Sequence, residues 1–257
     1  MVSSEKYLKI ANKVVDAAAD YLIKKFGSIK KMSHKEGSHY GIREDIDCNR
    51  LYEKLLTRYT PEFSLYTEEG KKSLENEYVW VVDPIDGTSN YSVGNPFFAT
   101  QICLLAREEP VLSVVYAPLL KQRFVATKGG GSFLNNNQVF VGMLEDMKRA
   151  VLVVGKGTNP QDTDWYIDTI AKVLKSVRTV RNFGSCGLEM SYVASGKLDI
   201  YLNHGSHIYD YAPGVLMVSE SGGQVINGDG KAWSIADKLL IASNKNLVSK
   251  VLEIINE

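Results

Sequence analysis

The chain has 257 residues, which is long enough to bury one large core or two smaller ones. Hydrophobic residues make up 44% and charged residues 23%, as in globular proteins, which argues against disordered and fibrous classes. Lys plus Arg and Asp plus Glu number 30 each, so the charge balance gives no general attraction to nucleic acid or to an anionic membrane.

The cysteines and the N-terminal segment indicate where in the cell the protein is expected. Cys48, Cys103 and Cys186 are scattered and odd in number, which indicates neither a disulfide framework nor a cysteine-rich zinc site. Charged residues interrupt Met1–Ala19, so this segment does not resemble a secretory signal, and no apolar stretch approaches the length of a membrane span. We therefore expect a cytoplasmic protein with no membrane partner.

The first half of the sequence predicts two helices and then antiparallel strands. Apolar residues recur at helical spacing over Ser4–Phe26, and a second helix is expected at about Asp47–Tyr59, before Pro61. Short apolar runs bounded by turn residues predict the strands. These runs are Phe63–Tyr66, Tyr78–Val82, Phe98–Leu105, Val111–Ala117, Arg123–Thr127 and a hairpin over Ser132–Val141.

From Ala150 onward strands and helices alternate, which is typical of a layered α/β structure. The expected strands are Val151–Val154, Ser176–Arg181, Leu198–Leu202 and a strand at Ala242, and the expected helices are Asp164–Lys175, Leu188–Ser195, Ala212–Ser221 and Asn246–Ile255. The pattern changes near Lys148 without a linker. We therefore predict an α/β (α+β) fold with two subdomains that share an interface, residues 1–148 and 149–257.

Trp80–Asn90 is the most informative segment of the chain. An apolar run ends in two carboxylates, Asp83 and Asp86, and the turn that follows at Gly87 offers the Thr88 hydroxyl and backbone N–H groups. Carboxylates are the ligands that Mg²⁺ prefers, and backbone donors with a hydroxyl suit phosphate oxygens. The segment predicts a site for Mg²⁺ and phosphate, although a simple turn would use the same residue types.

Two further acids precede this segment. Glu68 and Glu69 directly follow the predicted strand Phe63–Tyr66. Because neighbouring strands that end at the same sheet edge bring their loops together, this pair could join Asp83 and Asp86. A solvated corner of the surface is the alternative explanation for such a pair.

Other acids lie close to predicted helix starts. Asp210 precedes the helix Ala212–Ser221, where it could serve as an N-cap or as a metal ligand beside the helix N-terminus. Asp45 and Asp47 precede the second helix, where capping also explains them.

Taken in order, these segments resemble the inositol monophosphatase superfamily. Asp83–Asn90 matches the first signature of that family, Asp-Pro-Ile/Leu-Asp-Gly-Thr-x-Asn, without a mismatch, and Tyr209–Gly214 followed by Glu220–Gly223 resembles the second. Further similar segments are Glu68-Glu69, Gly94–Phe98, Val114–Pro118, Lys128–Gly131 and Arg181–Ser185. The resemblance spans nearly the whole chain and implies a layered α/β/α/β sugar-phosphatase sandwich with the site between two subdomains.

The resemblance also implies Mg²⁺-dependent hydrolysis of a phosphomonoester, with two or three metal ions that Mn²⁺ can replace. The implied metal ligands are oxygen donors: Glu68, Asp83, Asp86, Asp210 and the carbonyl of Ile85. Glu69 or Asp45 would join Glu68 in holding a weaker third ion.

Substrate and water contacts follow from the same resemblance. The implied substrate-binding residues are Asp86, Gly87, Thr88, Ser185 and Asn203. Glu68, Thr88 and the acid before the second helix would orient the attacking water. Between the two candidates we favour Asp47 over Asp45, because Asp47 lies closest to the start of the predicted helix.

The substrate itself stays open at this point. Asn203 stands where inositol monophosphatases have a glutamate that binds inositol hydroxyls, and an amide cannot make a charge-assisted hydrogen bond. Inositol 1-phosphate, fructose 1,6-bisphosphate and 3′-phosphoadenosine 5′-phosphate are all candidates. A second phosphate would need cations, for which the sequence offers Lys156, Arg178 and Arg181.

The expected partner is a small-molecule phosphate ester rather than nucleic acid, and the resemblance implies a lithium-sensitive homodimer. It also implies that the polar segment Ser28–Gly41 forms a loop that approaches the site. The alternative function is that of a catalytically silent relative that binds a ligand or RNA.

Overall fold

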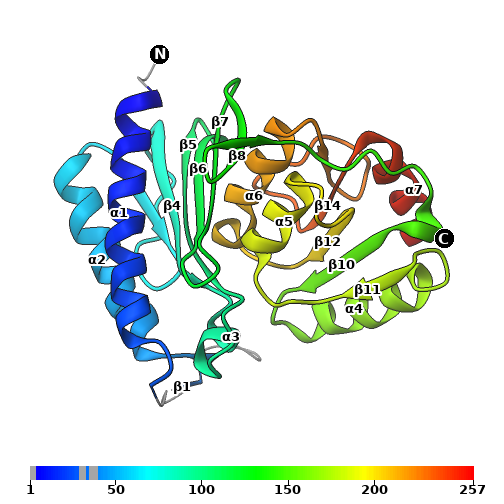
Figure 1. Cartoon of the computed structure of the whole chain (residues 1–257), viewed down its shortest axis with the longest axis horizontal. Helices are drawn as coiled ribbons and strands as arrows, with labels where there is room; N and C mark the ends of the chain where they lie inside the picture. Colours follow the sequence, from blue (N-terminus) through cyan, green and yellow to red (C-terminus); the bar gives the residue numbers. More distant parts are fainter. Residues whose placement is uncertain (1–3, 29–32, 35–39) are drawn as a thin grey trace.

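The computed structural model describes residues 4–28, 33–34 and 40–257, and the alternating layers of its helices and sheets are visible in Figure 1. Most of the segment Ser28–Gly41 lies outside the described residues, apart from a short antiparallel pair of strands, β1 (Ser33–His34) and β2 (Tyr40–Gly41). Its predicted approach to the site therefore stays a prediction.

A seven-stranded sheet forms the core of the first half. Its order is β3-β4-β5-β6-β7-β8-β9, in which β3 and β4 are parallel and all other neighbours are antiparallel. The strands are β3 (Ser64–Thr67), β4 (Tyr78–Asp86), β5 (Ala99–Ala106), β6 (Glu109–Ala117), β7 (Gln122–Thr127), β8 (Gly131–Leu134) and β9 (Asn137–Val139). The helices α1 (Ser4–Lys25) and α2 (Arg43–Tyr59) cover one face of this sheet (Figure 1).

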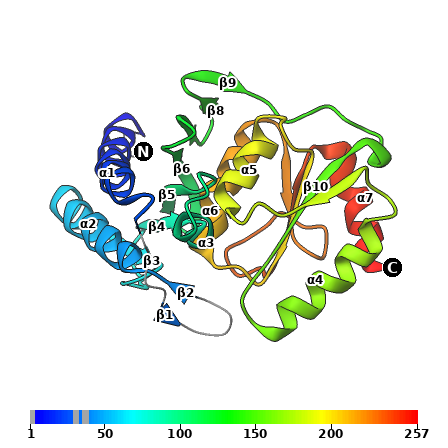
Figure 2. The ribbon, with the colours of Figure 1, turned by 60° about the horizontal axis from the view of Figure 1, so that its bottom comes forward.

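A five-stranded mixed sheet forms the second half, in the order β11-β10-β12-β14-β13. Its strands are β10 (Val151–Lys156), β11 (Thr179–Arg181), β12 (Ile200–His204), β13 (Gln224–Ile226) and β14 (Leu239–Ser243). Figure 2 shows α5 (Cys186–Ala194) and α6 (Ile208–Glu220) between the two sheets, and α4 (Pro160–Val173) and α7 (Lys245–Asn256) on the outer side of the second. A one-turn 3₁₀ helix, Met147–Arg149, precedes β10.

Three apolar clusters hold the layers together. One joins α1 and α2 to the first sheet around Trp80 and Tyr52, both fully buried, and another joins the second sheet to α4 and α7. The largest cluster fills the space around α5 and α6, whose residues are apolar on nearly all sides because a sheet lies on each side of them.

The layered α/β fold is thus confirmed, with α4 and α7 adding a fifth layer to the four that were expected. The chain passes from the first sheet to the second between β9 and β10, and the predicted boundary at residues 148 and 149 stays a prediction. Within the described residues, no helix has the length and apolar character needed to cross a membrane.

Three helix starts differ from the prediction by about one turn, and one of them is α4, which begins at Pro160 rather than Asp164. α2 begins at Arg43 rather than Asp47, and α6 begins at Ile208 rather than Ala212. In α2 and α6, the third helical residue is an aspartate whose carboxylate accepts a backbone N–H from the cap: Asp45 from Ile42 at 2.8 Å, and Asp210 from His207 at 2.6 Å. These aspartates therefore lie inside the first turn of their helices and are not N-cap residues.

Candidate active site

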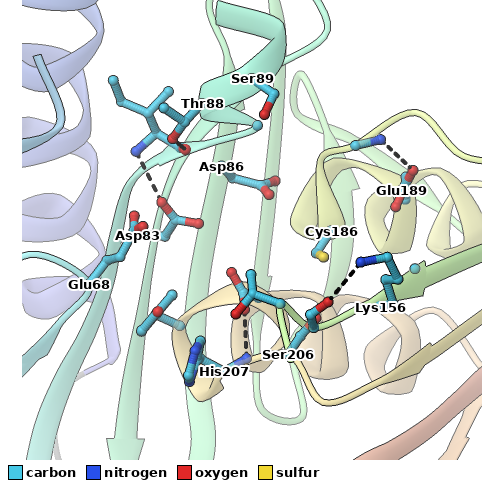
Figure 3. Close-up of a pocket in the computed structure, with 18 of the residues that line it drawn as sticks. Glu68, Asp83, Asp86, Thr88, Ser89, Lys156, Cys186, Glu189, Ser206 and His207 are labelled. Carbon is cyan, nitrogen blue, oxygen red and sulfur yellow. Dashed lines mark hydrogen bonds between the residues drawn. The ribbon is translucent and has the colours of Figure 1, made fainter. Parts of the chain in front are cut away.

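A cavity of about 300 Å³ lies where the ends of β4, β10 and β12 meet the starts of α3 (Thr88–Ser92), α5 and α6. Figure 3 shows its acidic side chains and, across from Glu68 and Asp83, Lys156. The lining residues are Glu68, Asp83, Ile85–Ser89, Gly155–Thr158, Asn182, Gly184, Cys186, Glu189, Ser206, His207, Tyr209 and Asp210.

Strand pairing brings Glu68 beside Asp83. Thr67 at the end of β3 pairs with Val82 of β4, and the backbone N–H of Glu68 donates to the carbonyl of Val82 at 3.1 Å. Because β3 and β4 are parallel, their carboxyl ends lie at the same sheet edge. Glu68, directly after β3, and Asp83, near the end of β4, therefore reach the same cavity.

An irregularity in β4 lets Asp83 and Asp86 face the same cavity. Residues three positions apart point to opposite faces of a regular strand. The register between β4 and β5 shifts between Asp83 and Asp86, and Gly87, with φ of 95°, turns the chain directly afterwards. Both carboxylates consequently line the cavity while remaining 3% and 4% exposed.

Asp86 links the two halves of the site. Its Oδ2 accepts hydrogen bonds from the Ser185 hydroxyl at 2.6 Å and from the N–H groups of Gly187 and Leu188, at 2.9 and 3.3 Å, in the first turn of α5. Burial raises the pKa of Asp86 to about 6, although these hydrogen bonds favour the charged form and oppose the increase. Ser185, which was predicted to bind substrate, is 1% exposed and does not line the cavity, but it holds Asp86 in place.

Asp83 and Asp210 are held by other donors. Oδ1 of Asp83 accepts the N–H of Ile85 at 3.0 Å, and Oδ2 lies 3.4 Å from the amide nitrogen of Gln101. Burial, followed by the nearby charge of Glu68, raises the pKa of Asp83. Burial likewise raises the pKa of Asp210, although the hydrogen bond from His207 opposes this shift. The charges of Glu68, Asp86 and Asp210 all raise the pKa of Asp83, so the acids of this site repel one another.

Asp45 and Asp47 lie in different surroundings, and only Asp45 contacts Thr88. The Thr88 hydroxyl lies 3.2 Å from Oδ1 of the fully buried Asp45 and 3.0 Å from the carbonyl of Ile85. Asp47 instead accepts hydrogen bonds from Tyr21 of α1 and from Arg43 in the first turn of α2. Because α2 starts a turn earlier than predicted, Asp45 rather than Asp47 is the acid beside Thr88, and which of the two orients the attacking water stays a prediction.

Five predicted site residues do not line the cavity: Asp45, Asp47, Glu69, Ser185 and Asn203. Asn203, 1% exposed on β12, donates to the hydroxyl of Tyr201 at 3.0 Å and is not among the described residues that line the site. Its predicted contact with substrate is therefore not supported. Glu69 follows Glu68 along the chain and is likewise outside the lining, so a role for it in a third metal site gains no support here.

Several lining residues were missed or left without a role by the sequence reasoning. Glu189, 2% exposed, accepts the N–H groups of Phe183 and Gly184 at 2.6 and 3.0 Å, and burial raises its pKa to about 8. Cys186 lines the cavity with a thiol whose pKa is raised by burial. Cys186 directly follows the recognised segment Arg181–Ser185 and Glu189 comes shortly after it, and that position was the available signal.

The donor set suits a hard divalent cation. Among the described residues, Oδ1 of Asp86 and Oδ1 of Asp210 receive no hydrogen bond from the protein, so each retains an oxygen for a ligand. No group of His, Cys, Asp or Glu in the described part forms a ready-made metal cage. Mg²⁺ would suit such a site, because it commonly binds through few carboxylates and completes its shell with water and phosphate oxygens.

Comparisons with known proteins agree with this geometry. A protein from Dictyostelium discoideum named inositol monophosphatase is 30% identical over 267 aligned positions, covering 100% of this chain and 97% of the relative. One from Aquifex aeolicus, named fructose-1,6-bisphosphatase/inositol-1-monophosphatase, is 28% identical and covers 99% and 97%. The solved structure of an IMPase from Thermotoga maritima superposes with a TM-score of 0.89 at 26% identity, covering 97% and 95%.

The family comparison covers almost every residue of the chain. The model of the inositol monophosphatase family matches residues 3–257, which include both sheets, the signature turn after β4 and the start of α6. The chain therefore belongs to the inositol monophosphatase family, whose members are phosphoric monoester hydrolases.

Proposed function

We propose that this protein is a Mg²⁺-dependent phosphomonoesterase that hydrolyses a small sugar or polyol phosphate by direct attack of water. One observation carries the proposal: Glu68, Asp83, Asp86 and Asp210 converge from both halves of the chain on one cavity that also exposes the turn at Gly87. Two or three Mg²⁺ ions, or Mn²⁺ in their place, would be held by these carboxylates and by the carbonyl of Ile85.

Each part of the cavity has a chemical task in this proposal. Bound Mg²⁺ would lower the pKa of water and neutralise phosphate charge. Thr88, whose hydroxyl lies between Asp45 and the Ile85 carbonyl, would orient the attacking water, with Glu68 on the other side. The first N–H groups of α3 lack partners within the helix and would receive phosphate oxygens.

The pairing of Thr88 with Asp45 suggests a proton route. A hydroxyl has one hydrogen, so Thr88 can donate to Asp45 or to Ile85 while its lone pairs accept a hydrogen bond from water. Asp45 is buried and already held by the N–H of Ile42, which fixes its orientation. Thr88 would thus position the water and pass its proton to Asp45, which would act as the general base.

The test is phosphate release by the purified protein with Mg²⁺, from inositol 1-phosphate, fructose 1,6-bisphosphate and 3′-phosphoadenosine 5′-phosphate. We expect Asp86→Asn and Asp45→Asn to lower kcat by about 100-fold or more, because general-base and charge contributions are of this size. Asp47→Asn, the matched control two positions further along α2, should change kcat by less than about 3-fold.

Two results would contradict the proposal. The first is an absence of phosphate release from every ester, which would favour a silent ligand-binding relative. The second is hydrolysis that Asp86→Asn leaves unchanged. Loss of activity in Asp47→Asn with none in Asp45→Asn would reverse the assignment of the water-orienting acid.

Family membership supports three further elements of the proposal: a homodimer, lithium sensitivity and a cytoplasmic location. The last also agrees with the cysteines, which are free and of which Cys48 and Cys103 are buried. Sedimentation, inhibition by LiCl and fractionation of cells would test them separately.

A further inference from the structure

The cavity has a second wall that the metal-binding acids do not use. It follows β10 and the loop after β12, and it contributes Gly155–Thr158 and Ser206. Figure 3 shows Lys156 and Ser206 on this side, across from Glu68 and Asp83. Since the phosphate would sit among the acids and the Gly87 turn, this wall faces the alcohol part of the ester.

Lys156 is the ammonium group of that wall. Its Nζ lies 3.3 Å from the carbonyl of the neighbouring Gly157, and within the described residues it makes no ion pair, although acids line the same cavity. An ammonium group is a strongly hydrated point charge with three donors. A single carbonyl at this distance leaves donors available for a ligand.

The other two cations that the sequence suggested lie elsewhere. Arg178 and Arg181 are exposed and do not line the described cavity, and Arg181 donates to Thr179 and to the carbonyl of Val180 instead. Of those three candidates, Lys156 alone reaches the site. The position that the resemblance associated with a charged inositol contact, Asn203, is buried and bound to Tyr201.

We propose that Lys156 is a specificity residue that binds a second anionic group on the alcohol part of the substrate. The hydroxyl groups of Thr158 and Ser206 line the same cavity and would complete the hydrogen bonding. The preferred substrates are then phosphate esters that carry a further phosphate or carboxylate. This inference rests on the proposed phosphatase function.

A purely electrostatic role for Lys156 makes a different prediction. If the ammonium only offset the negative charge of the acids, its removal would alter metal binding and so affect every ester alike. If it contacts the substrate, its removal would affect only esters with a second anion, mainly through KM. The comparison between classes of ester separates the two roles.

The experiment measures kcat and KM for two esters of neutral alcohols, inositol 1-phosphate and glycerol 2-phosphate, and for two with a second anion, fructose 1,6-bisphosphate and 3-phosphoglycerate. For Lys156→Gln we expect kcat/KM to fall about 10- to 100-fold for one or both of the anionic pair, as for a lost charged hydrogen bond. The neutral pair should change less than about 3-fold. Lys156→Arg should restore part of the loss, and Arg181→Gln is the matched control outside the cavity.

The two anionic esters distinguish the group that is recognised: a loss confined to fructose 1,6-bisphosphate identifies phosphate, and one confined to 3-phosphoglycerate identifies carboxylate. An equal loss for all four esters, or none, overturns the inference while leaving the phosphatase function intact. If the wild-type protein releases no phosphate at all, the proposed function fails. Calorimetric binding of the same esters to wild type and Lys156→Gln then decides the inference: equal affinities overturn it.

Discussion

Gln101 shows how single residues of this chain compensate for one another. Pro213 lies in the second turn of α6 and has no N–H to donate to the carbonyl of Tyr209 four positions earlier. The fully buried amide of Gln101 donates to that carbonyl at 3.0 Å and to the carbonyl of Asp210 at 3.1 Å. Gln101 thereby stabilises the helix turn that presents Asp210 to the site.

Gly187 makes room for this arrangement. A Cβ at Gly187 would lie 1.8 Å from Oε1 of Gln101. Gly187→Ala should therefore displace the Gln101 amide and destabilise the protein by about 1–3 kcal/mol, as overpacking does, which lowers Tm by about 2–10 °C at this chain length. Thermal unfolding and kcat are the measurements.

The matched control is the double variant that carries both Gln101→Ser and Gly187→Ala, measured beside the two single variants. Because the shorter serine vacates the space, the double variant should lose less stability than the sum of the two single variants. Additive losses would mean that the contact between Gln101 and Gly187 does not limit packing here.

At the residue level, the sequence was a good guide to the acids and a poor one to their neighbours. Glu68, Asp83, Asp86 and Asp210 were all expected in one site, and all of them line the cavity. Gln101 carries no motif, and its role depends on a proline more than a hundred positions away. Asn203 has the right position in the sequence, but its side chain turns to Tyr201.

Among the elements, α5 makes several hydrogen bonds to residues in and beside the site. Its first turn binds Asp86, and Glu189 within it holds the backbone of Phe183 and Gly184, whose carbonyl closely approaches Gly87. Because burial raises the pKa of Glu189 to about 8 from 4.5, the folded state binds the proton of this group more tightly than the unfolded state does.

The stability that Glu189 contributes to the fold decreases as the pH rises. The contribution of Glu189 to stability is fully present below about pH 4.5 and is lost as the pH rises towards 8. The Glu189→Gln side chain cannot ionise. The difference in unfolding free energy between this variant and wild type should therefore shift in favour of the variant by on the order of 1–3 kcal/mol between pH 5 and pH 8, and its Tm relative to wild type should rise accordingly. Melting curves of both proteins without metal provide the measurement, and a difference that is independent of pH would count against a neutral Glu189.

The elements themselves were predicted well where a pattern was long. Helices α1 and α7 and strands β5, β6 and β7 match their expected ranges to within two residues, because each has a clear apolar period. The starts of α2 and α6 were missed because Ile42 and His207 occupy the cap positions, where neither is a typical residue. The short elements α3 and β13 offered too few residues for any period.

On the scale of the whole molecule, the site exists because two sheets meet around α5 and α6. Glu68, Asp83 and Asp86 lie at the carboxyl ends of β3 and β4 in the first sheet. Asp210 comes from the second half of the chain, more than a hundred positions later. No local pattern predicts such a meeting. The prediction that these acids share one site came from the resemblance to a known family, and the structure and the family match agree with that prediction.

The central claim is that these converging carboxylates bind metal, and a calorimetric titration of the protein with MgCl₂ tests it most directly. We predict at least two bound Mg²⁺ per chain, and an affinity that falls about 10-fold or more in Asp83→Asn, because this residue would contribute to two metal sites. The exposed Asp164→Asn on α4 is the control and should bind as wild type does. Absence of Mg²⁺ binding by the wild-type protein, or equal binding by Asp83→Asn, would contradict the account.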